Sequence, residues 1–241
     1  MDWSKAKSIL IISFLLLNLS LGYQLYLKQN KYSNNMQWTT NNLDELQELL
    51  FKQNIKLSTE IPEQLPKMHF IKIRKIVFAE NEKLKGGLEE NSNRNVIELI
   101  ANKSIKNFEL YEFNPLESKE PDYLVYYQTT EGYPLLGAKL IIYLNSNGEL
   151  FYNQNYFEIV DSGLDKQVIS SYSALRRVIE QGLIPNGAEI KQIKLSYYGQ
   201  TNQSNIQILT PVWKIVFKNV QITDKLYVNA MTGGMENVIN Y

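Results

Sequence analysis

The most continuous apolar stretch of the chain lies near its start, at residues 8–27, and contains no charged residue. An α-helix rises about 1.5 Å per residue, so roughly 20 such residues are enough to cross the hydrocarbon core of a bilayer. Lysines lie on both sides of the stretch. The pattern predicts a transmembrane helix over residues 8–27, a short cytosolic tail over residues 1–7 and a polar stalk over residues 28–41.

Two other structures compete for this stretch. A cleaved signal peptide would use residues 9–17 as its apolar region and Ser20-Leu21-Gly22 as a cleavage site, but apolar residues continue to Leu27. A buried core helix is disfavoured, because a helix that is apolar all round needs a larger protein around it. The flanking lysines are balanced, so the free amino terminus and the long C-terminal region predict a cytoplasmic N-terminus and an extracellular C-terminal domain.

The apolar stretch carries two stripes of small or polar residues. The first stripe lies on one helical face and consists of Ser13, Leu17, Ser20 and Gln24. The second consists of Asn18 and Gly22 and lies nearly opposite. Such residues within a span often face another helix, since lipid offers no hydrogen bonds, although mild ones are also tolerated singly. The candidate protein-interaction residues are Ser13, Leu17, Asn18, Ser20, Gly22 and Gln24.

The chain after residue 41 has the pattern of an α+β protein. Asn42 is a candidate cap for a helix that ends near residue 53, whose leucines recur on one face. Runs rich in β-branched and aromatic residues follow, and Asn147-Gly148 favours a hairpin between two of them. The predicted strands are 68–79, 96–100, 108–113, 123–130, 135–144 and 149–160.

A second helix-plus-strands pattern follows the boundary at residues 161–163. Ser170 or Ser171 caps the predicted helix, which ends before Gly182. Strands are expected at 190–198, 209–217 and 225–230. The prediction is therefore two modules, each a helix with an antiparallel sheet, at residues 42–161 and 162–241.

Composition excludes several classes of function. The chain has 25 basic and 25 acidic residues, so no basic excess points to nucleic acid. It has no cysteine, which rules out disulfides, thiol nucleophiles and thiolate metal sites. An exported domain without disulfides suits the surface of a Gram-positive cell.

The chain offers little catalytic chemistry. His69 is the one histidine, and the sequence contains neither a Gly-x-Ser-x-Gly elbow nor a His-Glu-x-x-His helix. It also lacks the glycine-rich loops that bind nucleotide phosphates. The acidic pairs at Asp44-Glu45, Glu80 with Glu82, and Glu89-Glu90 are typical of solvated surface. We therefore expect no catalytic residue, no metal and no cofactor.

Tyrosines are concentrated in the central strands. Some of them are expected to fill the core, while the rest cover a sheet face that helices leave open. That face could bind a sugar or another protein. This observation supports an alternative function, an exported binding module or protease inhibitor that is only tethered by its helix.

The N-terminal residues resemble a known family. The opening Met1-Asp2-Trp3-Ser4-Lys5-Ala6-Lys7-Ser8-Ile9, with Phe14-Leu15-Leu16-Leu17-Asn18 and Leu21-Gly22-Tyr23-Gln24-Leu25, is similar to the start of the YycI family. The C-terminal part, with Leu209-Thr210-Pro211-Val212-Trp213-Lys214-Ile215 and Tyr227-Val228-Asn229-Ala230-Met231-Thr232-Gly233-Gly234, resembles PepSY-like modules.

The YycI resemblance implies a function. Members of this family are membrane-anchored regulatory proteins of the WalK/WalR (YycG/YycF) two-component system of low-GC Gram-positive bacteria. The resemblance implies that this protein acts with a YycH-like anchored partner and contacts a WalK-type sensor histidine kinase through its transmembrane helix. It would thereby adjust cell-wall metabolism without catalysing a reaction.

Overall fold

The computed structural model describes residues 3–35, 43–84, 93–199, 205–220 and 222–236. The chain divides into two compact units, residues 1–41 and residues 42–241. The first unit contains the helix α1 (Trp3–Asn35). The predicted stalk at residues 28–41 is therefore helical as far as Asn35, and its remaining residues lie outside the described ranges.

The second unit combines short helices with long strands. The helices are α2 (Leu43–Lys52), α3 (Arg94–Ser104) and α4 (Ser171–Glu180), with a 3-10 turn at Phe108–Leu110. The strands are β1 (Lys56–Leu57), β2 (Lys67–Met68), β3 (Ile71–Lys83), β4 (Tyr111–Phe113), β5 (Tyr123–Thr130), β6 (Tyr133–Leu144), β7 (Leu150–Ser162), β8 (Lys166–Gln167), β9 (Glu189–Tyr198), β10 (Ile206–Asn219) and β11 (Ile222–Asn229).

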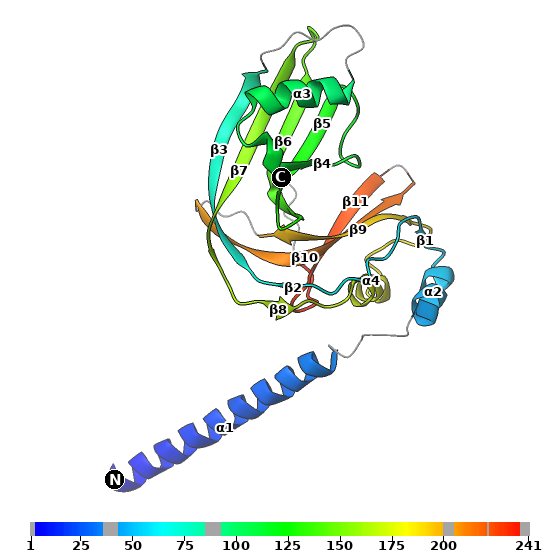
Figure 1. Ribbon diagram of the computed structural model, residues 1–241. Coiled ribbons are helices and arrows are strands. Elements are labelled where there is room, and N and C mark those ends of the chain that lie inside the picture. Colours follow the sequence, from blue (N-terminus) through cyan, green and yellow to red (C-terminus); the bar gives the residue numbers. More distant parts are fainter. Residues whose placement is uncertain (1–2, 36–42, 85–92, 200–204, 221, 237–241) are drawn as a thin grey trace. The chain divides into compact units, whose positions relative to one another are not determined.

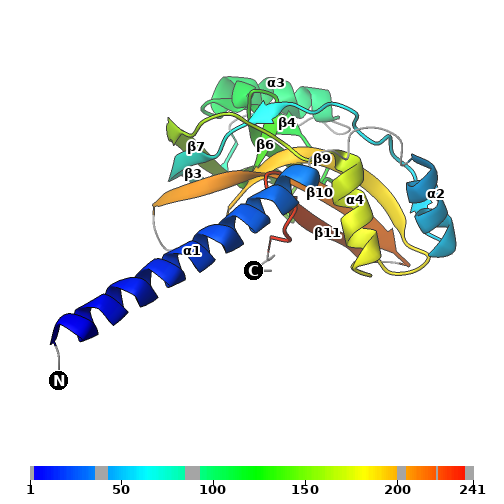
Figure 2. The same cartoon turned by 90° about the horizontal axis from the view of Figure 1, so that it is seen from below.

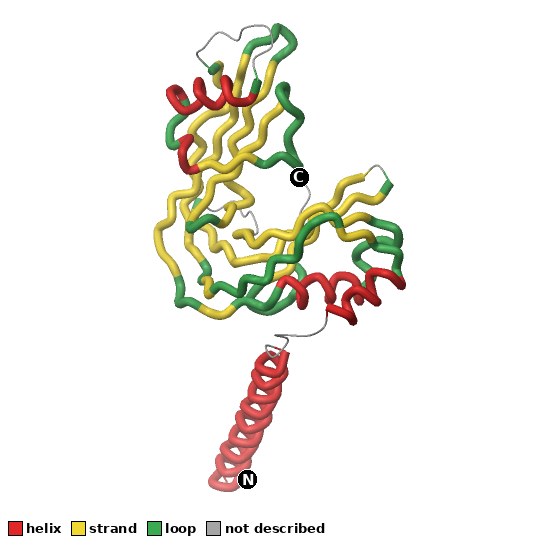
Figure 3. The backbone as a smooth tube through the Cα atoms, turned by 45° about the vertical axis from the view of Figure 1, so that its right-hand side comes forward, coloured by secondary structure: helices red, strands yellow, loops and turns green. Residues whose placement is uncertain are grey.

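Most strands belong to one sheet with the order β1-β9-β10-β3-β7-β6-β5-β4, and β11 pairs with β10. The long strand β10 bridges two regions, because its first residues pair with β3 and its later residues lie between β9 and β11. We call β3 to β7 the α3 half-sheet and β1, β9, β10 and β11 the α4 half-sheet. Figures 1 and 3 show the two half-sheets, each with its helices on the outer side.

One apolar core lies under α3, and a second lies under α4 and also takes in residues of β3, β6 and β7. Ile97 and Ala101 of α3 are fully buried against residues of β5, β6 and β7. Leu175 and Val178 of α4 are fully buried with Trp213 of β10. Helix α2 joins the second core and lies beside α4, as Figure 2 shows. Each core holds together an antiparallel sheet that is covered by helices on one face.

The α+β class and the long antiparallel strands are confirmed. The predicted strand 123–130 coincides with β5, and the strands predicted on either side of Asn145 match β6 and β7 within a few residues. The prediction of a helix capped by Ser170 or Ser171 is also confirmed; the cap is Ser170, whose side chain accepts a hydrogen bond from the Ser173 N–H at 3.1 Å.

The strand predicted at residues 96–100 is wrong, because these residues lie in α3. The Asn93 side chain caps this helix by accepting the Val96 N–H at 3.3 Å. Ile97 and Ala101 are one helical turn apart, so they face the core together. The short run at residues 96–100 favours a strand because it is rich in β-branched residues. The helical period becomes visible only when the run is considered together with its neighbours in α3.

Residues on both sides of the predicted module boundary at 161 contribute to the same sheet. β10 belongs to the predicted second module and pairs with β3 of the first. Leu209 lies opposite Ile71, and Ile206 lies opposite Arg74. Helix α2 precedes that boundary but packs with α4, which follows it. In the second unit, the first strand and the last three strands belong to the α4 half-sheet, and the strands of the α3 half-sheet lie between them in the sequence.

Two turns in the two half-sheets have the same chemistry. The Asn145 side-chain oxygen accepts the N–H groups of Asn147 and Glu149, each at 2.9 Å. The Asn229 side-chain oxygen accepts those of Met231 and Thr232, at 2.9 and 3.0 Å. Each Asn follows a Tyr and an aliphatic residue at the end of a strand, and in both turns its side chain accepts the N–H of the residue two positions on.

Candidate functional site

The predicted interaction residues lie on α1 and are exposed. Ser13, Leu17, Ser20 and Gln24 form one stripe on this helix, and Asn18 and Gly22 form the second. A methyl group added at Gly22 would meet no atom within 4 Å. All six residues are exposed: Ser13, Leu17, Asn18, Ser20, Gly22 and Gln24.

The apolar side chains of α1 are exposed on every side of the helix. Their exposed fractions run from 49 % at Leu21 to 74 % at Leu10. The set comprises Leu10, Ile11, Ile12, Phe14, Leu15, Leu16, Leu17, Leu19, Leu21, Tyr23, Leu25 and Tyr26. A large exposed apolar surface of this kind marks a site of interaction with a membrane or a protein.

Within the described part of the chain, no helix is both long enough and apolar enough to qualify as a membrane-spanning candidate.

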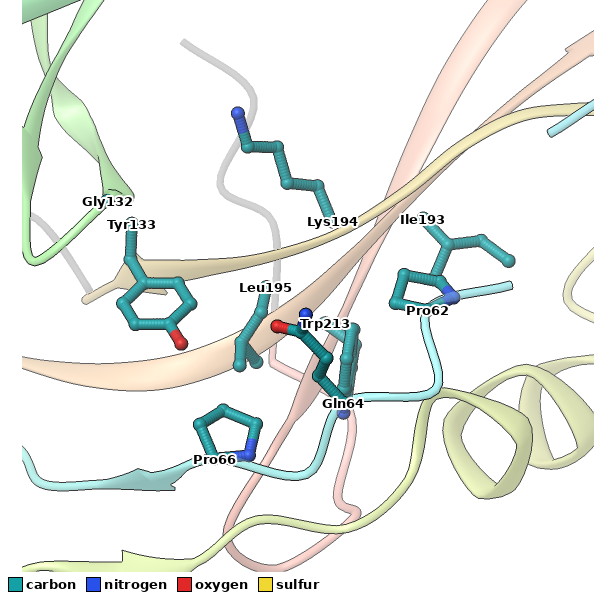
Figure 4. A pocket seen from close by; sticks show the side chains of 9 residues that line it. All are labelled: Pro62, Gln64, Pro66, Gly132, Tyr133, Ile193, Lys194, Leu195 and Trp213. Atoms are coloured by element: carbon teal, nitrogen blue, oxygen red, sulfur yellow. The ribbon is translucent and has the colours of Figure 1, made fainter. Parts of the chain in front are cut away.

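A cavity of about 180 Å³ lies on the α4 half-sheet. Figure 4 shows its lining, which comes from the loop before β2, the turn between β5 and β6, and strands β9 and β10. The lining residues are Pro62, Gln64, Pro66, Gly132, Tyr133, Ile193, Lys194, Leu195 and Trp213. No local pattern in the sequence indicates this cavity, because its walls come from four separate segments.

Two polar side chains of this lining, those of Trp213 and Lys194, are engaged with residues outside it. The Trp213 indole N–H donates to the Ile169 carbonyl at 2.9 Å. The Lys194 ammonium pairs with the Glu112 carboxylate at 3.0 Å. The lining contains no carboxylate and no histidine. The cavity can therefore receive a small apolar group, but its own lining supplies no acid–base pair.

His69 lies between β2 and β3, and its Nδ1 is 2.8 Å from an Asp165 carboxylate oxygen. No group of three or more His, Cys, Asp and Glu residues that could hold a metal occurs among the residues that the structure describes. The acidic candidates lie apart. Glu45 pairs with Arg176 at 2.7 Å, and Glu82 accepts the Tyr152 hydroxyl at 2.9 Å. Glu89 and Glu90 lie outside the described residues.

A partly buried ionic cluster connects the two half-sheets, and sequence reasoning missed it. The Glu117 carboxylate, in the loop between β4 and β5, is 2.8 Å from the Lys214 ammonium of β10 and 3.0 Å from the Lys139 ammonium of β6. The Tyr127 hydroxyl of β5 donates to the same carboxylate at 2.8 Å. Only 4 % of the Lys214 side chain is exposed. We call these four residues the Glu117 cluster.

The electrostatics of this cluster favour a charged carboxylate. Burial by itself raises the pKa of Glu117, but the charge and hydrogen bond of Lys214, with those of Lys139 and Tyr127, lower this pKa to about 2. Burial lowers the pKa of the Lys214 ammonium, and Glu117 opposes that shift. Burial also raises the pKa of the Tyr127 hydroxyl, so this group stays a hydrogen-bond donor. The cluster therefore holds a carboxylate between two ammonium groups.

One feature of the sequence could have indicated this cluster. Lys214 stands in the middle of the apolar run Val212-Trp213-Lys214-Ile215-Val216. A lysine in a strand that is buried on both faces needs a carboxylate partner, because an unpaired buried charge is costly. The sequence does not predict which carboxylate is the partner, because Glu117 precedes Lys214 by almost one hundred residues.

Comparison with known proteins identifies the family. The chain is similar to an uncharacterized protein from Eubacterium rectale whose crystal structure is known, at 11 % identity and a TM-score of 0.46, over 84 % of this chain and 83 % of that one. None of the curated proteins matches the chain. The family model described as YycI protein matches residues 84–231. Because that match covers more than half of the chain, this protein belongs to the YycI family.

Proposed function

We propose that this protein is a membrane-anchored regulator that binds a WalK-type sensor histidine kinase, together with a YycH-like partner, and adjusts its activity without catalysing a reaction. Membership of the YycI family supports a role in two-component signal transduction. The family is regulatory, which favours action by binding. Through the kinase, the protein would influence cell-wall metabolism.

The observation that carries the membrane part of this proposal is the surface of α1. Residues 10–26 contain no charge, and their apolar side chains are exposed all round the helix. At about 1.5 Å per residue, these 17 residues extend for about 25 Å, and the uncharged stretch continues for one or two residues at each end. Lipid is the solvent that suits such a surface, so we place the protein in the cell membrane as a single span with its second unit outside.

The stripes on α1 supply the proposed contact with the kinase. Ser13, Ser20 and Gln24 can donate hydrogen bonds to a neighbouring helix, and Gly22 allows close approach of a second backbone. A regulator changes the balance between two kinase states only if it binds them with different affinity. Packing against one arrangement of the kinase helices would provide that difference.

The test is co-purification from native membranes. The tagged full chain is isolated in mild detergent, beside a variant in which an unrelated transmembrane helix replaces residues 8–27. We expect the native form to bring down a sensor kinase and a second anchored regulator, and the swapped form to lose the kinase. Equal amounts of the two forms in the membrane serve as the control.

The opposite result would favour the exported binding module. If the native form brings down neither protein but binds wall polymer or a protease, the helix is only a tether. The swapped form should then bind the same target, because recognition would lie in the tyrosine-rich sheet or in the cavity lined by Trp213 and Tyr133.

A further inference from the structure

We propose that the cavity lined by Trp213 and Tyr133 binds a small organic amine, with the apolar part of the ligand inside the cavity and its ammonium at the rim. The inference rests on residues 42–241 alone. It holds whether the protein regulates a kinase or acts as an exported binding module, and it gives the second unit a ligand of defined chemical class.

The inner part of the cavity is apolar. Trp213 and Leu195 are only 1 % and 6 % exposed, and Ile193, Pro62 and Pro66 add further apolar surface to the lining. The volume of the cavity is about 180 Å³, and an apolar cavity of about 150 Å³ accommodates one benzene molecule. The cavity therefore has room for a single six-membered ring or for a chain of similar size.

Two polar groups of the lining are free to bind a ligand. Figure 4 shows the Tyr133 hydroxyl and the Gln64 amide converging on Leu195. Neither group has a hydrogen-bond partner among the residues that the structure describes. Each group carries an oxygen that accepts hydrogen bonds, so the N–H groups of a ligand would satisfy both.

The rim of the cavity carries negative charge. Glu63 and Glu131 are exposed, and each is next to a lining residue in the chain. Neither carboxylate has an ion-pair partner in the described part of the chain. Lys194 is the charged residue of the lining, but its side chain points away from the cavity and pairs with Glu112 at 3.0 Å (Figure 4). The charge of the site therefore favours a cation over an anion.

The order of these groups selects the kind of amine. A lysine side chain would enter with its ammonium first and bring the charge against Trp213 and Leu195, where burial of a charge is costly. An amine whose apolar group enters first keeps its ammonium at the rim, where Tyr133, Gln64 and the carboxylates accept its hydrogen bonds. A free alkylamine has this chemistry, and so does the N-terminal residue of a peptide when its side chain is apolar.

The fluorescence of Trp213 can report binding in the cavity. The chain has three tryptophans, so Trp3→Phe and Trp38→Phe in the full chain in detergent leave Trp213 as the single fluorescent tryptophan. The probes are cyclohexylmethylamine, cyclohexylmethanol and cyclohexanecarboxylate, which share one ring and differ in charge. We expect a saturable change with the amine, about fivefold weaker binding of the alcohol and no binding of the carboxylate.

Variants at exposed positions locate the binding site. Glu63→Gln and Glu131→Gln keep the size of the side chain, and each should weaken binding of the amine about threefold without changing that of the alcohol. Gln64→Phe fills the mouth of the cavity and should abolish binding of both, which also measures any signal from probe dissolved in detergent. Glu80→Gln is the matched control, because Glu80 is an exposed acid outside the lining, and it should change neither affinity.

Two results would overturn the proposal: equal binding of the three probes, or amine binding that survives Gln64→Phe. If circular dichroism shows that Gln64→Phe does not fold, the Glu63→Gln and Glu131→Gln variants decide, and unchanged amine binding in both contradicts the site.

Leucinamide and N-acetyl-lysine methylamide distinguish the sources of the amine. Leucinamide that binds as tightly as cyclohexylmethylamine assigns the N-terminal residue of a peptide, whereas binding of the cyclohexyl amine alone assigns a free alkylamine. Tighter binding of the lysine derivative than of either would show that the charge enters first, and would overturn the proposed orientation.

Discussion

At the scale of single residues, the most informative side chain is Lys214. Its neighbours on β10 alternate between the two faces of the strand: Trp213 and Ile215 enter the core under α4, and Val212 enters the contact with β5. The lysine lies on the latter face, where its charge is neutralised by Glu117. This partly buried pair is one contact between the two half-sheets, which are also joined by the pairing of β3 with β10 and of β6 with β9.

Replacing Glu117 by Gln should destabilise the second unit by about 3 kcal/mol at pH 7, because it leaves a buried ammonium unpaired. The folded pKa of Glu117, about 2, is below its ordinary value of 4.5. The ionised carboxylate therefore contributes its full stability above about pH 4.5 and loses it as the pH falls toward 2. Urea unfolding of wild type and variant at a series of pH values measures this difference.

The control for that prediction is Glu158→Gln. Its pair with Arg74 is about half exposed on both sides, so we expect a loss of at most about 1 kcal/mol. A difference between wild type and Glu117→Gln that stays constant down to pH 2 would show that the carboxylate is not held by the two lysines.

At the scale of elements, the helices show where a local pattern is sufficient. α4 has an N-terminal cap and a regular apolar stripe, and the prediction of this helix succeeded. α3 has a cap as well, but its β-branched residues around Ile97 favoured a strand. α2 was expected as a helix, yet nothing in its sequence indicated that it lies beside α4 rather than over the strands that follow it.

The packing of α2 can be tested with Leu46→Ala. Leu46 is 2 % exposed in the core under α4, so its truncation should cost about 2–5 kcal/mol. Amide exchange should increase in α4 but not in α3. Phe51→Ala on the same helix is the control, because Phe51 is 88 % exposed and should matter little. Faster exchange in α3 alone would contradict this arrangement.

The proposed contact of α1 with a partner is open to a separate experiment. Changing Ser13, Ser20 and Gln24 to Leu together removes the hydrogen-bonding groups of one stripe but keeps the helix apolar. We expect less sensor kinase to co-purify, with the amount of this protein in the membrane unchanged. Asn18→Leu with Gly22→Leu tests the other stripe. Unchanged kinase recovery and output in both variants would remove α1 as the contact.

At the scale of the whole molecule, the two compact units suggest a division of roles. Residues 42–241 contain all the sheet and both large cores. α1 contributes a surface that is apolar on every side. An exposed surface of this type is stable in lipid and prone to aggregation in water. The first unit would then hold the protein at the membrane while the second recognises its partners.

Deleting residues 1–41 should therefore give a soluble, folded fragment, and the full chain should sediment with membranes and resist extraction by salt. Fractionation followed by detergent extraction checks the location, and the cooperative unfolding of the fragment checks its fold. A full chain that is recovered mainly in the soluble fraction would contradict the anchor, and a fragment that fails to unfold cooperatively would show that the second unit depends on the first.

Local patterns determined a large part of this protein. The apolar helix, the strands from Tyr123 to Val160, the cap at Ser170 and the turn at Asn145 all depend on interactions between residues close in the chain. The composition also limits function directly: the absence of cysteine excludes disulfides and thiolate sites, and the balance of charges argues against binding of nucleic acid. These features could be predicted because their energetics are local.

Only the tertiary structure decided how the pieces combine. The placement of α2 beside α4, the pairing of β3 with β10 and the meeting of Glu117 with Lys214 all join residues that are far apart in sequence. The energy of each contact depends on the burial and shape of both partners at once, and a single segment carries no record of its partner. For this reason the sequence indicated an anchor and an α+β domain, whereas the cavity and the Glu117 cluster appeared only in the folded molecule.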